Sequence, residues 1–349
     1  MEALLSLLPQ RLLPWYAAHR RDLPWRRDRE PYHVWLSEIM LQQTRVEAVK
    51  GYYLRFLERY PTISALAAAE ETELLKLWEG LGYYSRARNL QKAARIIQQE
   101  YGGIFPRDYT AIRKLPGIGD YTAGAISSIC FDAKTPAVDG NVLRVMSRIL
   151  DDHSCTDDPA VKRRFSQTLA EVYPEQAGDF TQALMELGAT VCLPNGAPKC
   201  GECPMRDLCR ARKNHTIEEL PVRAEKRPRK QEDMTVFLLT CGDAVALRRR
   251  PNSGLLAGLY EFPHKPGILS PEEMIQTAEE WGLHPRFLEK TVSRKHIFTH
   301  IQWNMTGVRL HCGAQNDQFL WKTRADVASS IALPTAFRQF LSDIWEDLV

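Results

Sequence analysis

The pattern of apolar and polar positions divides the chain into two parts. From residue 4 to about residue 212, apolar residues recur at spacings of three and four, which is typical of amphipathic helices. From Met234 onward, short apolar runs alternate with polar residues, which indicates strands with a few helices between them. We therefore predict a mainly helical first part and an α+β second part.

The same pattern predicts individual elements. In the first part it predicts helices that include residues 34–53, 70–77, 86–101 and 141–150. In the second part it predicts strands at residues 235–240, 244–247 and 302–310, and helices at 271–280 and 335–345.

Length and composition agree with this division. The chain has 349 residues, enough for two domains, and its 44% hydrophobic and 26% charged residues exclude a wholly disordered chain. No apolar run reaches the length of about 18 residues that a membrane span needs, so we expect no membrane partner, and we expect no signal peptide. The net charge of +3 permits a nucleic-acid partner without requiring one.

A segment rich in prolines and basic residues separates the two parts. We predict domains at residues 1–222 and 233–349, joined by a basic linker at residues 223–232. The linker is either a solvated connection or a stretch whose positive charge also follows a phosphate backbone.

Four of the eight cysteines lie within one short stretch. They form the pattern C-x7-C-x2-C-x5-C at Cys192, Cys200, Cys203 and Cys209. Four thiolates this close would repel one another unless a cation held them, and the absence of an export signal favours a metal centre over disulfides. Both zinc and an iron–sulfur cluster suit four cysteines, and the spacing leaves that choice open.

A turn with two glycines lies between two helical stretches. Gly117 and Gly119 let the backbone turn tightly, and the next helix is predicted to begin near Asp120 or Tyr121. Exposed N–H groups beside the positive end of a helix suit one DNA phosphate without any base readout. The plainer alternative is a turn that merely connects two helices.

Two acidic residues flank this turn along the sequence. Glu38 has apolar neighbours, so its carboxyl group should favour the protonated form that a general acid needs, unless it is a surface residue of an amphipathic helix. Asp139 precedes a helix, where it would act as N-cap, and amides there would keep it ionised. An acid and an anion in opposite environments form the usual pair for breaking a glycosidic bond.

Together these motifs resemble the helix-hairpin-helix DNA glycosylase superfamily, and within it the adenine DNA glycosylases. The resemblance covers nearly the whole chain and is carried, in order, by residues 37–45, 78–89, 115–119, 137–144 and 182–188, the four cysteines and residues 298–300. It implies a helical catalytic domain in two lobes, with a [4Fe–4S] cluster held by the four cysteines at residues 192–209, and a C-terminal Nudix-like domain. One departure is the spacing of the first two cysteines, which are separated by seven residues where the family usually has six.

The resemblance also implies a reaction. The family removes adenine mispaired with 8-oxoguanine, and also adenine opposite guanine, from double-stranded DNA by hydrolysis, which leaves an abasic site and prevents G:C to T:A transversions. By resemblance, Glu38 protonates N7 of the extruded adenine and Asp139 stabilises the positive sugar. Further positions match residues that hydrogen-bond around the sugar and the acids, Tyr121 and Asn141, and residues of the adenine pocket, Arg26 and Gln182.

Tyr121 also distinguishes an adenine DNA glycosylase from the main alternative, a glycosylase that excises pyrimidine lesions and cleaves the strand. Bifunctional relatives, which excise pyrimidine lesions, carry a lysine at this position and cleave the strand through a Schiff base, which a phenol cannot form. The resemblance therefore implies a monofunctional glycosylase. A second rival, an inert DNA-binding module, is opposed by the presence of both Glu38 and Asp139.

Residues that contact DNA can be assigned by the same resemblance. Gln43, Leu81 and Tyr83 match residues that enter the base stack near the lesion, where wedge-shaped side chains fill the space of a flipped base. Plain packing is the alternative for Tyr83, and it is the preferred role of Tyr84.

The second part resembles a Nudix domain whose catalytic cluster is incomplete. Its residues 272–282 keep Glu279 and Glu280 but lack the remaining carboxylates that would bind Mg²⁺, which opposes hydrolysis of a nucleotide diphosphate. A loop that reads 8-oxoguanine in the family matches Phe298, Thr299 and His300, with threonine where the family more often has serine. We expect a bacterial, cytoplasmic monomer associated with the nucleoid through DNA.

Overall fold

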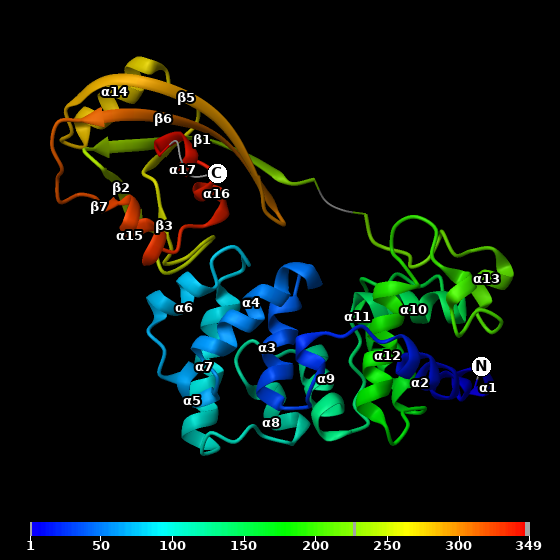
Figure 1. Cartoon of the computed structure of the whole chain (residues 1–349). Coiled ribbons are helices and arrows are strands. Elements are labelled where there is room, and N and C mark those ends of the chain that lie inside the picture. The colour runs from blue at the N-terminus through cyan, green and yellow to red at the C-terminus, as the bar shows by residue number, and fades with distance from the viewer. Residues whose placement is uncertain (1, 226–227, 346–349) are drawn as a thin grey trace. The chain divides into compact units, whose positions relative to one another are not determined.

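A computed structural model describes residues 2–225 and 228–345 (Figure 1). Contacts divide the chain into two compact units. The helical unit comprises Met1–Ala68 and Asn89–Glu225, and the mixed unit comprises Ala69–Arg88 and Lys226–Val349. No helix in the described ranges is both long enough and apolar enough to cross a membrane.

The helical unit contains helices and two single 3-10 turns. Its elements are α1 (Glu2–Leu5), α2 (Leu7–His19), η1 (Pro24–Arg26), α3 (Pro31–Leu41), α4 (Val46–Arg59), α5 (Ile63–Ala67), α7 (Ser85–Glu100, whose first four residues belong to the mixed unit), α8 (Tyr109–Lys114), α9 (Asp120–Phe131), α10 (Gly140–Leu150), α11 (Pro159–Ala170), α12 (Ala177–Thr190), η2 (Cys200–Glu202) and α13 (Arg210–Asn214).

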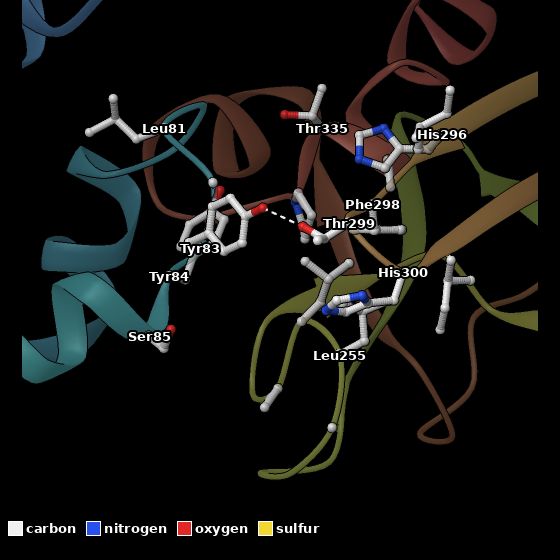
Figure 2. Close-up of a pocket in the computed structure, with 18 of the residues that line it drawn as sticks. Leu81, Tyr83, Tyr84, Ser85, Leu255, His296, Phe298, Thr299, His300 and Thr335 are labelled. Atoms are coloured by element: carbon white, nitrogen blue, oxygen red, sulfur yellow. Dashed lines mark hydrogen bonds between the residues drawn. The ribbon is translucent and has the colours of Figure 1, made fainter. Parts of the chain in front are cut away.

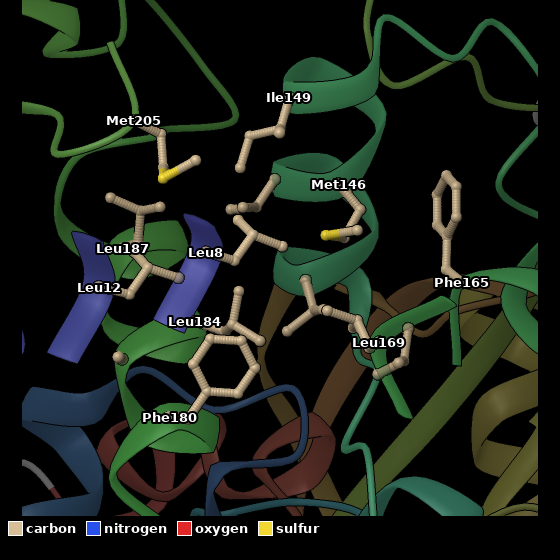
Figure 3. Packing of buried hydrophobic residues seen from close by; sticks show 14 of the residues in the cluster. Leu8, Leu12, Met146, Ile149, Phe165, Leu169, Phe180, Leu184, Leu187 and Met205 are labelled. Atoms are coloured by element: carbon tan, nitrogen blue, oxygen red, sulfur yellow. The ribbon is translucent and has the colours of Figure 1, made fainter. Parts of the chain in front are cut away.

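A buried core between α2, α10, α11 and α12 fixes two of the helices that carry site residues, α10 and α12. Side chains from all four helices point into it, together with Met205 from the cysteine-rich loop (Figure 3). Leu8 and Leu12 of α2 are fully buried there. Burying each such leucine contributes about 1.5–3 kcal/mol, so the start of α10 and the inner face of α12 are held in place by this core.

One predicted helix, residues 34–53, is two helices in the structure. α3 ends at Leu41 and α4 begins at Val46. Between them Gln43 has a φ of 58°, in the left-handed region where a right-handed helix cannot continue. The prediction was wrong here because apolar spacing continues across the break.

The mixed unit is built on a seven-stranded sheet. Its elements are α6 (Glu71–Leu77), β1 (Lys230–Cys241), β2 (Ala244–Arg249), β3 (Tyr260–Glu261), β4 (His264–Pro266), α14 (Pro271–Glu280), β5 (Pro285–Ile297), β6 (Ile301–Cys312), β7 (Leu320–Thr323), α15 (Arg324–Ser329), α16 (Thr335–Arg338) and α17 (Leu341–Ile344). The predicted helix at residues 335–345 is two short helices in the structure, with the break at Gln339 and Phe340.

The sheet has the strand order β3-β2-β1-β6-β5, with β4 paired to β1 and β7 paired to β2. β1 and β6 run parallel, while β5 and β6 form an antiparallel hairpin. Successive residues of a strand point to opposite faces, so Val236 and Phe237 enter separate cores. The turn of the β5–β6 hairpin carries Phe298, Thr299 and His300.

The predicted linker at residues 223–232 is shorter in the structure. β1 already begins at Lys230, whose N–H donates to the carbonyl of His300, and residues 226–227 lie outside the described ranges. Just before them, the Val222 carbonyl accepts bonds from the N–H and hydroxyl of Thr156, and the Ala224 N–H donates to Asp157. This stretch is therefore bound to the helical unit.

Candidate active site

Most residues predicted for catalysis and adenine binding line one cavity of the helical unit. The cavity has a volume of about 540 Å³. Seven predicted residues line it: Arg26 of η1, Glu38 of α3, Gln43 of the α3–α4 turn, Tyr121 of α9, Asp139 and Asn141 at the start of α10, and Gln182 of α12. Residues far apart in sequence are therefore brought to one place.

Glu38 has the apolar surroundings that its sequence context predicts. Every residue of α3 from Val34 to Met40 is buried, and Glu38 itself is only 7% exposed. Burial raises the pKa of its carboxyl to about 7; the Tyr121 hydroxyl lowers the pKa, Asp139 raises it and Arg26 lowers it. Near neutral pH a large share of Glu38 thus carries a proton that it can donate.

Asp139 is the N-cap of α10. Its Oδ1 accepts the N–H of Val142 at 2.8 Å, and its Oδ2 accepts Nδ2 of Asn141 at 2.8 Å. Arg144 in turn donates from Nη2 to Oδ1 of Asn141 at 2.9 Å and from Nε to the carbonyl of Cys192 at 2.8 Å. The carboxylate is therefore held by both of its oxygens, and its holder Asn141 is itself tied to the cysteine-rich loop.

Gly188 permits this arrangement. A Cβ at Gly188 of α12 would lie 2.7 Å from the Cβ of Asn141, so α12 approaches α10 more closely than any side chain would allow. The carbonyl of Gly188 also accepts a bond from Arg144.

A buried carboxylate that the sequence reasoning missed holds two arginines of the cavity. Glu186 is fully buried; Arg21 donates to it from Nε at 2.7 Å and from Nη2 at 2.8 Å, and Arg26 donates from Nη2 at 2.8 Å. Burial raises the pKa of Glu186, but these hydrogen bonds outweigh burial and leave the pKa below its usual value. Glu186 follows Gln182 by four residues, so helical spacing places both on one face of α12.

The two glycines of the predicted phosphate turn join α8 to α9. Gly117 has a φ of 78°, and a Cβ there would lie 2.8 Å from the Cβ of Asn89, so the turn requires glycine. Gly119 is the N-cap of α9, which begins at Asp120 as predicted. Both glycines are exposed.

The four cysteines of the predicted cluster line one small cavity of about 30 Å³ beside α10. All four are free of disulfides. Burial raises the pKa of Cys203 to about 12, and the other three thiols of the set raise it too. Arg148 of α10 donates from Nη1 to Sγ of Cys192 at 3.3 Å. Within the described ranges no group of three or more Cys, His, Asp or Glu side chains is arranged to hold a metal ion.

The remaining predicted residues line a second cavity, of about 510 Å³, in the mixed unit (Figure 2). The Tyr83 hydroxyl and Oγ1 of Thr299 are hydrogen-bonded at 2.7 Å. Tyr83 is 47% exposed and has a φ of 46°, whereas Tyr84 is buried, in keeping with the packing role expected for it. The other predicted residues here are Leu81, which is buried, Phe298, and the exposed His300.

Comparison with known proteins agrees with this architecture. Residues 36–171 match the HhH-GPD superfamily of base excision DNA repair proteins, and residues 235–343 match the NUDIX domain. A thermostable thymine-DNA glycosylase has a similar fold, with a TM-score of 0.55 and 29% identity over 61% of this chain and 98% of that one. Endonuclease III in a non-covalent DNA complex gives a TM-score of 0.51 and 26% identity over 60% of this chain and 97% of that one.

These similarities define the class as a helix-hairpin-helix DNA glycosylase joined to a Nudix-like domain, and they confirm the predicted fold class. The adenine DNA glycosylase of Rattus norvegicus is 35% identical over an alignment that covers 94% of this chain and 77% of that protein. The chain belongs to the adenine DNA glycosylase family.

Proposed function

We propose that this protein removes adenine opposite 8-oxoguanine, and opposite guanine, from double-stranded DNA by hydrolysing the N-glycosidic bond. The observation that carries the proposal is the pair of carboxyl groups in one cavity. Glu38 is buried with a pKa of about 7, and Asp139 is held through both oxygens at the start of α10. Two carboxyl groups in such different environments can divide acid and electrostatic roles between them.

Each step of the reaction has a group in this cavity. The adenine must first leave the stack and enter the cavity. Protonated Glu38 gives its proton to N7, and the bond between the sugar and the base breaks with its electron pair passing to adenine. Asp139 stabilises the positive charge that develops on the sugar. Water then adds to the sugar carbon and gives its proton to the Glu38 carboxylate, which restores the acid and leaves an abasic site.

Tyr121 supports hydrolysis without strand cleavage. Burial raises the pKa of Tyr121 well above its usual value, and the charges of Glu38 and Asp139 raise it further. The phenol therefore stays protonated and acts as a hydrogen-bond donor. It offers no amine for a Schiff base, so the product is an intact strand with an abasic site.

Substrate recognition is divided between the two cavities. Arg26, held by Glu186, and Gln182 would bind the extruded adenine. Around the lesion, Gln43, Leu81 and Tyr83 would enter the stack, and Phe298, Thr299 and His300 would read 8-oxoguanine. The Gly117–Gly119 turn would bind a phosphate. The protein would act on this DNA as a monomer.

Cys192, Cys200, Cys203 and Cys209 would hold the [4Fe–4S] cluster. Their support is the chemistry of the donor set, four free thiols lining one cavity. When bound, the cluster would supply a rigid attachment for the loop at residues 192–209. Arg148 would then donate a hydrogen bond to one of the sulfur ligands.

The proposal is tested with Glu38→Gln and Asp139→Asn, each assayed for base release and for binding to a duplex with adenine opposite 8-oxoguanine. Both variants should lose base release by a factor of about 10²–10⁴ while they still bind the duplex. Glu47→Gln, on the exposed surface of α4, serves as control. Base release at the unaltered rate in either variant would contradict the assigned roles.

A further inference from the structure

The segment that carries Leu81 and Tyr83 is attached to the Nudix-like part by two charged side chains. Lys76, in the last turn of α6, donates from Nζ to the carbonyls of Val327 at 2.9 Å and Ile331 at 3.0 Å. Its third donor meets Oε2 of Glu79 at 2.8 Å. A lysine ammonium has three donors, so all of them are engaged. The two carbonyls lie at and beyond the C-terminal end of α15, where helix carbonyls lack internal partners.

Glu79 forms the second part of this attachment, through the residues that follow α15. Its Oε1 accepts the backbone N–H of Leu333 at 2.9 Å, and its Oε2 lies 3.6 Å from Nη1 of Arg338 on α16. The side chains of Lys76 and Glu79 are only 19% and 11% exposed. Water therefore screens this pair far less than a surface ion pair.

The chain between this attachment and α7 is fixed internally. Nε1 of Trp78 donates to the carbonyl of Gly82 at 3.1 Å, and Nη2 of Arg86 donates to the carbonyls of Leu81 at 2.8 Å and Gly82 at 3.1 Å. Tyr83 keeps a left-handed backbone at the tip. Since the loop is internally rigid, its placement against the β5–β6 hairpin depends on the residues that dock it.

That placement sets the distance between two groups in the second cavity. The hydroxyls of Tyr83, on the docked loop, and Thr299, in the hairpin turn, are hydrogen-bonded at 2.7 Å where both residues line the cavity (Figure 2). Each is exposed, and each hydroxyl can donate or accept. A base edge that enters the cavity could replace this hydrogen bond with its own hydrogen bonds to the two hydroxyls.

We propose that Lys76 and Glu79 are positioning residues for recognition of the base opposite the adenine. By docking the loop they hold Tyr83 at a fixed separation from Thr299, so that both side chains can contact 8-oxoguanine at the same time. This inference rests on the proposed function and names residues that set its lesion specificity. Neither residue touches DNA in this role.

The experiment measures single-turnover adenine release opposite 8-oxoguanine and opposite guanine in Lys76→Met and Glu79→Gln. The ratio of the two rates should fall about tenfold in each variant, because a displacement of about 1 Å can cost 10²-fold in rate at a positioned site. Release opposite guanine should change less than about twofold, since the catalytic cavity is untouched. Lys76→Arg, which keeps charge and donors, should restore most of the ratio.

Lys50→Met is the matched control. Lys50 forms an ion pair with Glu47 at 2.9 Å, also three residues apart, on exposed α4. It should leave the ratio unchanged. In a Tyr83→Ala background, Lys76→Met should have almost no further effect on the ratio, since the residue it positions is gone.

Three results bear on the inference. An unchanged ratio in folded Lys76→Met and Glu79→Gln, or an equal fall of both rates, would overturn the positioning role and leave the proposed function standing. A full additional loss in the Tyr83→Ala background would overturn the route through Tyr83. A parent protein that shows no preference for 8-oxoguanine would contradict the proposed function itself.

Discussion

Glu38→Gln should slow base release and should gain stability relative to the parent as the pH rises. Burial raises the pKa of Glu38 from 4.5 to about 7 in the folded protein. Between these two values the folded state binds one proton more than the unfolded state, so stability falls as the pH rises through this window. At 1.36 kcal/mol per pKa unit, ionisation of Glu38 lowers the free energy of unfolding of the parent by about 3 kcal/mol in total. The Glu38→Gln variant, which has no ionisable group there, does not undergo this loss.

Urea unfolding at pH 5 and pH 8, followed by circular dichroism, measures this loss in the helical unit. The difference in unfolding free energy between Glu38→Gln and the parent should grow by about 2.5 kcal/mol from pH 5 to pH 8, because a small part of the loss already occurs below pH 5. Comparing two pH values removes the effect of the substitution on packing, which is the same at both. Glu47→Gln, whose parent side chain is 79% exposed, should show no such growth.

The same pKa predicts the rate profile of the parent protein. The protonated share of a group with a pKa of about 7 falls about tenfold between pH 6 and pH 8, and single-turnover base release should fall with it. A rate that stays level across this range, together with an equal pH dependence of stability in parent and Glu38→Gln, would refute the reasoning from burial.

Three further substitutions test the surroundings of the acids. Tyr121→Phe removes the hydroxyl that lowers the pKa of Glu38, so the alkaline limb of the rate profile should move to higher pH. Arg26 lowers the pKa of Glu38, and Glu186→Gln removes the negative charge that partly offsets Arg26, so the alkaline limb should move to lower pH. An alkaline limb that does not move in either variant would argue against this coupling. Gly188→Ala should push Asn141 aside and lower stability by about 1–3 kcal/mol in urea unfolding.

Local chemistry of the site was predictable from sequence. Asp139 stands directly before an apolar helical stretch, and it is the N-cap there. Glu38 lies among apolar residues, and burial does raise its pKa. α14 spans Pro271–Glu280 as predicted, because Ser270 and Glu273 form a capping box with proline at the first turn.

Long-range partners could not be predicted in the same way. Glu186 meets Arg21 across 165 positions, and no local pattern signals a contact that tertiary packing creates. Lys76 likewise reads as an ordinary surface lysine, yet it bonds to carbonyls 251 and 255 positions away. The break at Gln43 was hidden because apolar spacing continues through it.

Single-turnover base release tests the proposed excision of adenine most directly. It is measured on duplexes with adenine opposite 8-oxoguanine, guanine and thymine, and on one with an oxidised pyrimidine. Each product is analysed with and without alkali. We predict adenine release that is fastest opposite 8-oxoguanine, with strand breaks only after alkali. Release of the oxidised pyrimidine with direct strand breaks would contradict it.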